Sequence, residues 1–361
     1  MYQEVSQLLM YGDLEENSIL RQMAELFGKY ETGEYNKTGL VRDINTQVKR
    51  ILKVATDYGF DDNLWHNYLT FFLMMSENPF SMTCEKVGAS EGSVNALVEN
   101  DFRIFKALFD YDFGPIERDL GINCFSQISN YKAIHKKDLM YNKNVSEKVR
   151  SLSKKLEAAK DEKEFFDAVT GFYKDYGVGM FGLNKAFRID DTPQGSFTFR
   201  AINNMDTVML DDLVGYEIQK KKLVDNTEAF VQGKKANNVL LFGDSGTGKS
   251  TSIKAIVNQY YKDGLRMIEI YKHQFKYLSE IIADIKNRNY RFIIYMDDLS
   301  FEEFEIEYKF LKAVIEGGVE TKPENILIYA TSNRRHLIKE SWNDRNDQDN
   351  SNDRHHSDTV E

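Results

Sequence analysis

The sequence has little cysteine and proline, no long hydrophobic run and no basic leader. Only two cysteines and four prolines occur in 361 residues. Cys84 and Cys124 match no metal-ligand spacing and form no disulfide framework, so we interpret them as reduced thiols. The longest apolar run, Tyr68–Met75, is far too short to cross a bilayer, and Met1–Leu9 carries Glu4 without the basic start of a signal peptide. We therefore expect a cytoplasmic protein that makes no use of a membrane.

Excess positive charge is also missing. The formal net charge is −10, which argues against a general grip on nucleic acid, because binding phosphate backbones needs a basic surface. A local basic patch remains compatible with this charge. Metal-ligand spacing is missing as well: His66, His135 and His273 have no partners at such spacing. We interpret these histidines as core or surface residues.

Helical periodicity dominates the first half of the chain, residues 1–187. Apolar residues recur at helical spacing over Ile19–Tyr30, Val41–Ala55, Phe102–Phe109 and Phe165–Tyr173. No fixed repeat period is present, so a regular solenoid is not supported. We predict a mostly α-helical N-terminal domain. Residues 188–210 contain the turn-forming stretch Asp190–Gly195 and no apolar period, and we interpret them as a linker.

From residue 211 the pattern changes to strands alternating with helices. Four short apolar runs suit strands buried on both faces of a parallel sheet, and helical stretches separate them: Asn238–Phe242, Arg266–Ile270, Phe292–Met296 and Ile326–Ala330. Such alternation predicts a doubly wound parallel α/β sheet over 211–340. Residues 341–361 are polar and are interpreted as a disordered tail.

The most specific motif is a glycine-rich segment that follows the first of these strands and precedes a helix. Its order matches the phosphate-binding P-loop at all four defined positions. Glycines let successive backbone N–H groups face a phosphate, and the helix N-terminus adds its dipole. We expect ATP and Mg²⁺ here, with Lys249 reaching the β- and γ-phosphates and Ser250 binding the metal ion. A glycine-rich turn without a ligand is the alternative. The expected nucleotide-binding residues are Gly243, Asp244, Ser245, Gly246, Thr247, Gly248, Lys249, Ser250 and Thr251.

Two later strands end in polar residues. Asp297 and Asp298 follow Phe292–Met296, and two carboxylates at the end of a buried strand are costly unless a cation or hydrogen bonds receive them. We predict that Asp297 holds Mg²⁺ and that Asp298 is the general base that orients water. The alternative is that both cap a helix beginning near Phe301. Asn333 ends the last strand; it can reach the γ-phosphate or the water if that strand lies between the other two.

The order of Gly243–Ser250, Asp297–Asp298 and Asn333 resembles the Walker A, Walker B and sensor 1 positions of AAA+ ATPases. Upstream, Asp212–Tyr216 resembles the segment that packs around adenine in this class. The resemblance implies that Val214, Gly215 and Tyr216 contact the base and that the chain is an ATPase.

Two longer stretches refine the resemblance. Met-Asp-Asp-Leu-Ser-Phe-Glu at Met296–Glu302 and Tyr-Ala-Thr-Ser-Asn-Arg-Arg-His-Leu at Tyr329–Leu337 are similar to the hallmarks of one bacterial group. That group is the domain-of-unknown-function family 815 of AAA+ ATPases. The resemblance covers about residues 211–361 and is vague over the helical half.

The sequence departs from the AAA+ pattern in two respects. Asp298 stands where most AAA+ ATPases have glutamate, as in the replication-initiator and helicase-loader branch, and its shorter side chain positions water less favourably. The family also continues beyond the segment resembling His356–Glu361 into a lid with an arginine finger and a second sensor. We therefore expect this sequence to be truncated before those parts and to hydrolyse ATP slowly.

Three function classes compete. The first is an ATPase that couples nucleotide state to an unknown protein partner bound by the helical half, with homo-oligomers as a further expectation. The second is an ATP-binding regulatory module with little hydrolysis. A kinase or GTPase is the third, but the only near match to a guanine-reading motif, Asn142–Val145, precedes the phosphate loop and lacks its acid.

Three other segments receive plainer interpretations. Arg334 and Arg335 follow Asn333 and are candidates for a phosphate or subunit contact, against an ordinary surface role. Lys220–Lys222 is interpreted as a solvated helix face. Tyr271–Phe275 follows the second strand, where protein-threading AAA+ machines carry an aromatic–hydrophobic–glycine loop, but the segment has no glycine. A protein-unfolding role loses weight accordingly.

Overall fold

A computed structural model describes residues 1–89, 92–133, 143–203, 205–302, 306–316, 323–333, 338–339 and 359–360. The chain divides into two compact units, Met1–Asn184 and Lys185–Glu361. Each is described by itself. Among the described residues, no helix combines the length and apolar character that a bilayer crossing requires.

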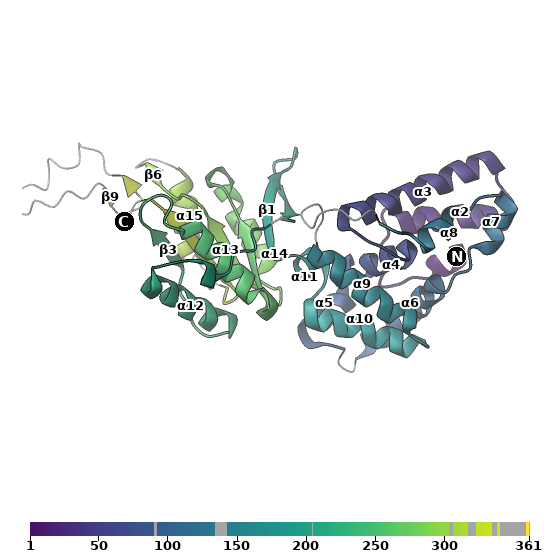
Figure 1. Cartoon of the computed structure of the whole chain (residues 1–361), viewed down its shortest axis with the longest axis horizontal. Helices are drawn as coiled ribbons and strands as arrows, with labels where there is room; N and C mark the ends of the chain where they lie inside the picture. The colour runs from purple at the N-terminus through teal and green to yellow at the C-terminus, as the bar shows by residue number, and fades with distance from the viewer. Residues whose placement is uncertain are drawn as a thin grey trace, which may run out of the picture. The chain divides into compact units, whose positions relative to one another are not determined.

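The first unit is built from helices, as predicted (Figure 1). Its helical segments are α1 (Tyr2–Val5), α2 (Ile19–Thr32), α3 (Lys37–Tyr58), α4 (Leu64–Met75), α5 (Pro79–Val87), α6 (Ser93–Phe109), α7 (Gly114–Leu120), α8 (Cys124–Ser129), α9 (Lys143–Ala158), α10 (Glu162–Tyr176) and α11 (Gly179–Leu183).

Local sequence signals set several of these helix boundaries. The side chains of Asn36, Asn63 and Asp161 accept hydrogen bonds from backbone N–H groups in the first turns of α3, α4 and α10, which satisfies donors that a helix leaves unpaired. Gly59 ends α3 with a φ of 69°, a left-handed conformation that costs glycine little. Capping residues thus separate consecutive amphipathic helices.

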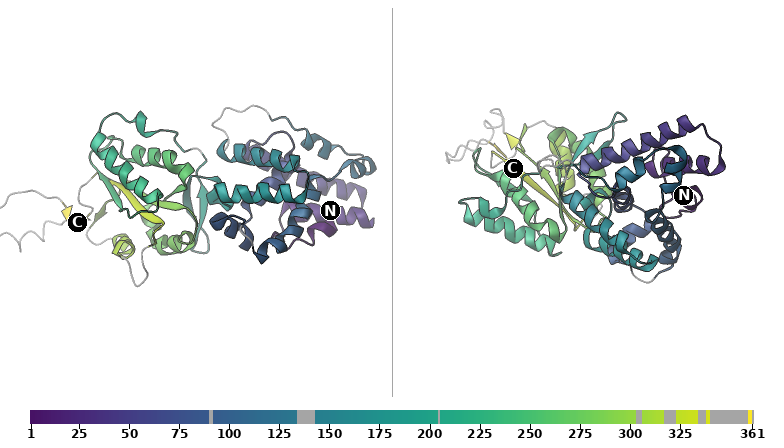
Figure 2. Two further views of the ribbon diagram at one scale, coloured as in Figure 1. Left: turned by 90° about the horizontal axis from the view of Figure 1, so that it is seen from below. Right: turned by 45° about the vertical axis from the view of Figure 1, so that its right-hand side comes forward.

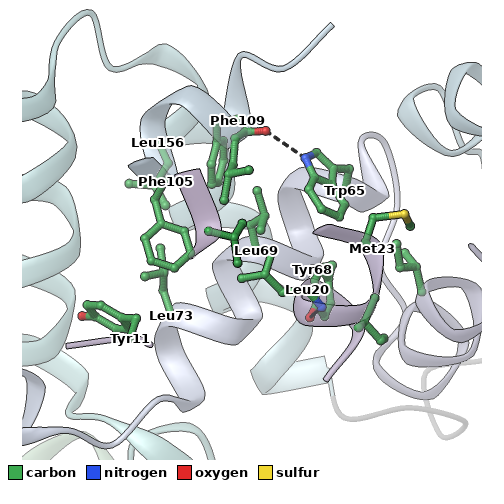
Figure 3. Close-up of a cluster of buried hydrophobic side chains, with 14 of the residues drawn as sticks. Tyr11, Leu20, Met23, Trp65, Tyr68, Leu69, Leu73, Phe105, Phe109 and Leu156 are labelled. Atoms are coloured by element: carbon green, nitrogen blue, oxygen red, sulfur yellow. Dashed lines mark hydrogen bonds between the residues drawn. The ribbon is translucent and has the colours of Figure 1, made fainter. Parts of the chain in front are cut away.

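Helix α4 runs through the centre of the first unit. Its side chains are buried on most sides, and Leu69 and Leu73 are fully enclosed. Figure 3 shows Trp65 of this helix beside the core, where its indole Nε1 donates to the Leu108 carbonyl at 2.9 Å. A helix that is apolar nearly all round must lie inside a bundle, because any exposed face would place apolar surface in water.

The second unit contains a six-stranded sheet in the order β2-β1-β4-β5-β7-β3. All neighbours are parallel except the antiparallel pair β1 and β2. This confirms the predicted doubly wound α/β class and all four predicted strands. The strands are β1 (Ala186–Asp191), β2 (Phe197–Ala201), β3 (Val239–Phe242), β4 (Leu265–Glu269), β5 (Arg291–Met296) and β7 (Ile326–Ser332).

Helices lie on both faces of this sheet (Figure 2). The side that includes Ile293 and Leu327 shares a core with α12 and α13, through residues such as Leu223 and Ile256. The remaining helices, α14 and α15, contact each other. The helical segments are α12 (Glu217–Val231), α13 (Lys249–Tyr260), α14 (Leu278–Ile285), α15 (Ile306–Glu316) and the 3₁₀ turns η1 (Leu210–Asp212), η2 (Tyr261–Asp263) and η3 (Lys272–Tyr277).

A small second sheet joins β6 (Phe301–Glu302), β8 (Ile338–Lys339) and β9 (Thr359–Val360). Strand β9 pairs antiparallel with β8. It falls within residues 341–361, which we interpreted as a disordered tail; the rest of that stretch lies outside the described residues.

The interpretation of residues 188–210 as a linker is wrong. Their first part completes β1 and forms β2, which extend the sheet beyond β4. The turn residues that suggested a linker form the hairpin loop instead, closed by a Thr192 N–H bond to the Ser196 carbonyl of 2.9 Å. Phe197 and Phe199 alternate with polar residues over only five positions, too short a stretch for the strand period to stand out.

One carboxylate anchors the N-terminal segment inside the first unit. Asp101 of α6 is fully buried, and it accepts backbone hydrogen bonds of 2.8–3.1 Å from Leu9, Met10 and Tyr11. Hydrogen bonds to a charged acceptor are stronger than neutral ones. Removing this acceptor would leave buried N–H groups unpaired.

We therefore expect Asp101→Ala to destabilise the first unit by about 3 kcal/mol, since buried donors lose a charged acceptor. Urea unfolding followed by Trp65 fluorescence, in a Trp342→Phe background, measures this loss. The control Asp13→Ala, at an exposed position, is expected to change the free energy of unfolding by less than about 0.5 kcal/mol. Equal effects of the two substitutions would contradict the anchoring role.

Candidate nucleotide site

Strand order brings the three predicted polar clusters together. β7 lies between β5 and β3, and Tyr329 of β7 is in register with both Tyr295 and Val239. Because all three strands are parallel, their carboxyl ends meet at one edge of the sheet, where ligands bind in open α/β folds. The condition set for Asn333, that its strand lies between the other two, is met.

The glycine-rich loop leaves β3 and enters α13. Gly246 and Gly248 adopt φ values of 78° and 82°, a region that side chains with a Cβ rarely enter. Gly248 is also the N-cap of α13. The loop therefore leads directly into the first turn of α13, where backbone N–H groups and the positive end of the helix dipole face the same region, which is the arrangement that binds phosphate.

Lys249 is held by oxygen atoms around the loop. Its Nζ donates to the carbonyls of Gly243 and Asp244, both at 2.7 Å, and to Asn333 Oδ1 at 3.2 Å. Asn333 Nδ2 donates in turn to Asp298 Oδ1 at 2.9 Å. Three of the predicted catalytic residues thus form one continuous hydrogen-bonded chain.

Asp297 directly follows β5, and its side chain contacts Ser250 in the first turn of α13. Ser250 Oγ donates to Asp297 Oδ1 at 2.8 Å, and Thr331 Oγ1 donates to the same oxygen at 2.5 Å. Burial alone would raise the pKa of Asp297, but the hydrogen bonds from Thr331 and Ser250, together with the neighbouring Tyr295 hydroxyl and the Asp298 backbone, outweigh burial and lower the pKa. The carboxylate is consequently charged at neutral pH and suited to a cation.

Asp298 has an unusual backbone conformation, with a φ of 49°. Its N–H donates to Thr331 Oγ1 at 2.9 Å, so Thr331 fixes both aspartates at once. The alternative that these aspartates cap a helix near Phe301 is wrong: β6 begins at Phe301 and α15 begins only at Ile306. The left-handed conformation turns Asp298 toward Asn333 instead of toward a helix end.

A cavity of about 610 Å³ adjoins the loop. Its lining includes Ser245–Lys249 and the segment Asp212–Tyr216, so the central part of the phosphate loop and the segment expected to contact adenine share one cavity. Val214 is 95% exposed and Tyr216 is 56% exposed, which leaves apolar surface available for a planar base. Four of the expected nucleotide-binding residues are not among the lining residues: Gly243, Asp244, Ser250 and Thr251.

Sequence reasoning missed three residues at this site. Thr331 and Tyr295 lie within strands, and nothing in the sequence distinguishes them from ordinary strand residues. Lys220 was assigned to a solvated helix face, but its Nζ donates to the Leu213 carbonyl at 2.7 Å and the residue lines the cavity. Its position one helical turn after Tyr216 is the signal that could have indicated this placement.

The remaining candidates lie elsewhere or outside the described residues. Arg334, Arg335 and His135 fall outside them. His66 Nε2 pairs with the Phe109 carbonyl at 2.8 Å, and burial lowers the pKa of its ring. Across the described ranges, no group of three or more His, Cys, Asp or Glu side chains could hold a metal ion. His273 stacks on Tyr271, with ring centroids 6.0 Å apart.

Comparison with known proteins gives both sequence and structural matches. The large subunit of replication factor C from Methanococcus vannielii is 34% identical over 74 residues, which are 20% of this chain and 15% of that protein. This chain therefore spans only a small part of that relative.

Two solved structures are similar over part of the chain. The Thermotoga maritima RuvB Holliday junction branch migration motor is 18% identical with a TM-score of 0.27, covering 36% of this chain and 43% of that one. PCH-2 of C. elegans is 17% identical with a TM-score of 0.28, covering 38% and 42%.

Residues 183–361 match the model of the family described as protein of unknown function (DUF815). The match begins immediately before β1 and includes the phosphate loop, both aspartates and Asn333. The second unit has a P-loop α/β fold, and residues 183–361 belong to this DUF815 family.

Proposed function

We propose that the second unit binds ATP with Mg²⁺ and hydrolyses it. The observation that carries this proposal is the pair of contacts at the start of α13: Ser250 to Asp297, and Lys249 through Asn333 to Asp298. Lys249, which takes part in the second contact, lines a cavity that is large enough for a nucleotide.

In this proposal, the phosphate loop and Lys249 bind the phosphates. Backbone N–H groups of Ser245–Lys249 and the N-terminus of α13 receive phosphate oxygens, and Val214, Gly215 and Tyr216 contact the adenine. Lys249 exchanges the carbonyls of Gly243 and Asp244 for phosphate oxygens. This exchange is favourable because a charged acceptor makes a stronger hydrogen bond than a neutral carbonyl.

The side-chain oxygen atoms of Ser250 and Asp297 suit a magnesium ion. Mg²⁺ prefers hard oxygen ligands and is usually held by one or two protein groups together with substrate phosphates. Ser250 and Asp297 offer a hydroxyl and a charged carboxylate 2.8 Å apart. When bound, the ion neutralises charge that develops on the phosphates.

In this proposal, Asp298 and Asn333 carry out the hydrolytic step. Asp298 Oδ1 and the Asn333 amide are paired at 2.9 Å beside Lys249, so both groups adjoin the expected end of the triphosphate. A carboxylate accepts the hydrogen bond of a water molecule and can take its proton, while an amide orients it. We infer that Asp298 is the general base.

A binding module with little hydrolysis is the second candidate. The Asn333 contact that favours catalysis also occupies the Asp298 carboxylate, and Asp298 is shorter than the glutamate usual in this class. A base that stays paired with its neighbour would leave water poorly oriented. Nucleotide state would then act through conformation alone.

We further propose that the first unit binds a protein partner and that copies of the chain assemble. The first unit has its own core and exposes large apolar side chains, among them Leu9 and Val87 at 59% and 61%. Beside the nucleotide cavity, Val214 and Ile218 are 95% and 71% exposed. Contiguous apolar patches mark contacts with other chains, and these residues are the first candidates for such a patch.

ATP with Mg²⁺ is expected to stabilise the wild-type chain by about 2.7 kcal/mol at a ligand concentration near 100 Kd. Lys249→Ala should abolish that stabilisation, because the main cation on the phosphates is lost. Thermal unfolding with and without nucleotide measures both effects. Lys262→Ala, an exposed lysine of η2, should keep the full shift. No shift in the wild-type chain would overturn the proposed binding.

Adenine is expected to be preferred over guanine, because no guanine-reading Asn-Lys-x-Asp motif follows the phosphate loop. Competition against a fluorescent ADP should rank ATP and ADP at least about tenfold, or 1.4 kcal/mol, ahead of GTP. Equal competition by GTP would refute the assignment of Val214, Gly215 and Tyr216 to the adenine.

Asp298→Asn is expected to reduce phosphate release at least about 100-fold while ATP affinity changes little, since loss of a general base affects the chemical step. Asparagine also tolerates the left-handed backbone at this position. Asp263→Asn, an exposed residue of η2, makes the same charge change and should leave the rate intact. Turnover that survives in Asp298→Asn would exclude Asp298 as the base, and a wild-type chain that binds ATP without turnover would favour the regulatory module.

A further inference from the structure

Tyr295 places a hydroxyl group under the magnesium-binding residues. The side chain is fully buried and belongs to the core between the sheet and α13. Residues two apart on a strand face the same side, so Tyr295 and Asp297 point toward α13, where Ser250 begins the helix. The ring packs in the core while the hydroxyl reaches the edge of the site.

The Tyr295 hydroxyl lacks a hydrogen-bond partner among the described residues. Burial raises the pKa of this hydroxyl most; the neighbouring Asp297 carboxylate also raises it, and the Ser250 and Thr331 hydroxyls lower it. Asp297 Oδ1 already accepts from Ser250 and Thr331. Three hydroxyls therefore surround one carboxylate, and only two of them donate to it.

A buried tyrosine hydroxyl without a partner is costly, and most such groups in proteins are paired. A small rotation of the Asp297 carboxylate would offer the Tyr295 hydroxyl an acceptor. Groups that hydrogen-bond to metal-binding side chains orient them and strengthen metal binding. An interaction present only in the magnesium-bound arrangement contributes its free energy to magnesium affinity.

Building on the proposed function, we propose that Tyr295 is a positioning residue of the magnesium site, whose hydroxyl donates to the Asp297 carboxylate when Mg²⁺ and nucleotide bind. Its contribution differs from that of an ordinary core residue. The hydroxyl weakens the ligand-free protein slightly and strengthens the magnesium-bound one.

Tyr329 offers a matched control. It is equally buried and directly opposite Tyr295 in the sheet register, but its hydroxyl is paired with Thr227 Oγ1 at 2.7 Å and Asn226 Nδ2 at 3.1 Å. Those partners belong to α12 and not to the magnesium site. Tyr329→Phe therefore removes a satisfied hydroxyl from the same core.

The experiment compares wild type, Tyr295→Phe and Tyr329→Phe. Calorimetry with a non-hydrolysable ATP analogue gives the half-saturating Mg²⁺ concentration and the affinity in EDTA, and thermal unfolding gives the midpoint without ligand. For Tyr295→Phe we expect about a tenfold rise in half-saturating Mg²⁺, unchanged affinity in EDTA, and an unchanged or higher midpoint. For Tyr329→Phe we expect a lower midpoint and the wild-type Mg²⁺ dependence.

The outcomes separate this inference from the proposed function. If wild type shows no Mg²⁺-dependent binding of the analogue, the proposed function fails and the inference fails with it. If wild type binds normally and Tyr295→Phe keeps the wild-type Mg²⁺ dependence, only the inference is overturned. A lower midpoint for Tyr295→Phe with equal Mg²⁺ shifts in both variants would assign Tyr295 an ordinary core role and also overturn it.

Discussion

The hydrogen-bond register of β7 against both β5 and β3 is the constraint on which the site depends. Pairing Tyr329 with Tyr295 on one side and Val239 on the other fixes where each strand ends. A slip of one residue would turn every side chain of the strand to the other face. The hydrogen bonds from Ser250 to Asp297 and from Lys249 to Asn333 would then be lost. The buried core and the candidate site therefore depend on the same register.

The polar groups at this sheet edge are largely paired with each other. Lys249, Asn333 and Asp298 form one chain, and Thr331 connects Asp298 to Asp297. Under the proposed function, nucleotide binding is an exchange of hydrogen bonds, and each exchange contributes only the difference between two partners. Charged phosphate oxygens and a metal ion would supply that difference, because they interact more strongly with these groups than neutral carbonyls and amides do.

Residues with special conformational or charge requirements could be predicted from the sequence. Gly248 and Lys249 identified the loop, and Asp297 stood out because a buried strand rarely ends in carboxylates without a ligand. Thr331 and Tyr295 could not be predicted, since threonine and tyrosine are common in strands and only the strand order shows what they contact. Strand β2 was not predicted for a related reason. In a strand of five residues the alternation of apolar and polar side chains is too short to outweigh the turn-forming residues beside it.

A crystal structure with Mn²⁺ and a non-hydrolysable ATP analogue tests the assignment of the site most directly. Manganese substitutes for magnesium at oxygen ligands and can be located by its anomalous scattering. We predict one manganese ion bound beside Ser250 Oγ and the Asp297 carboxylate, with Lys249 Nζ moved from the Gly243 and Asp244 carbonyls to the phosphates. A metal ion bound away from Ser250 and Asp297, or a nucleotide that leaves the Lys249 contacts unchanged, would contradict the assignment.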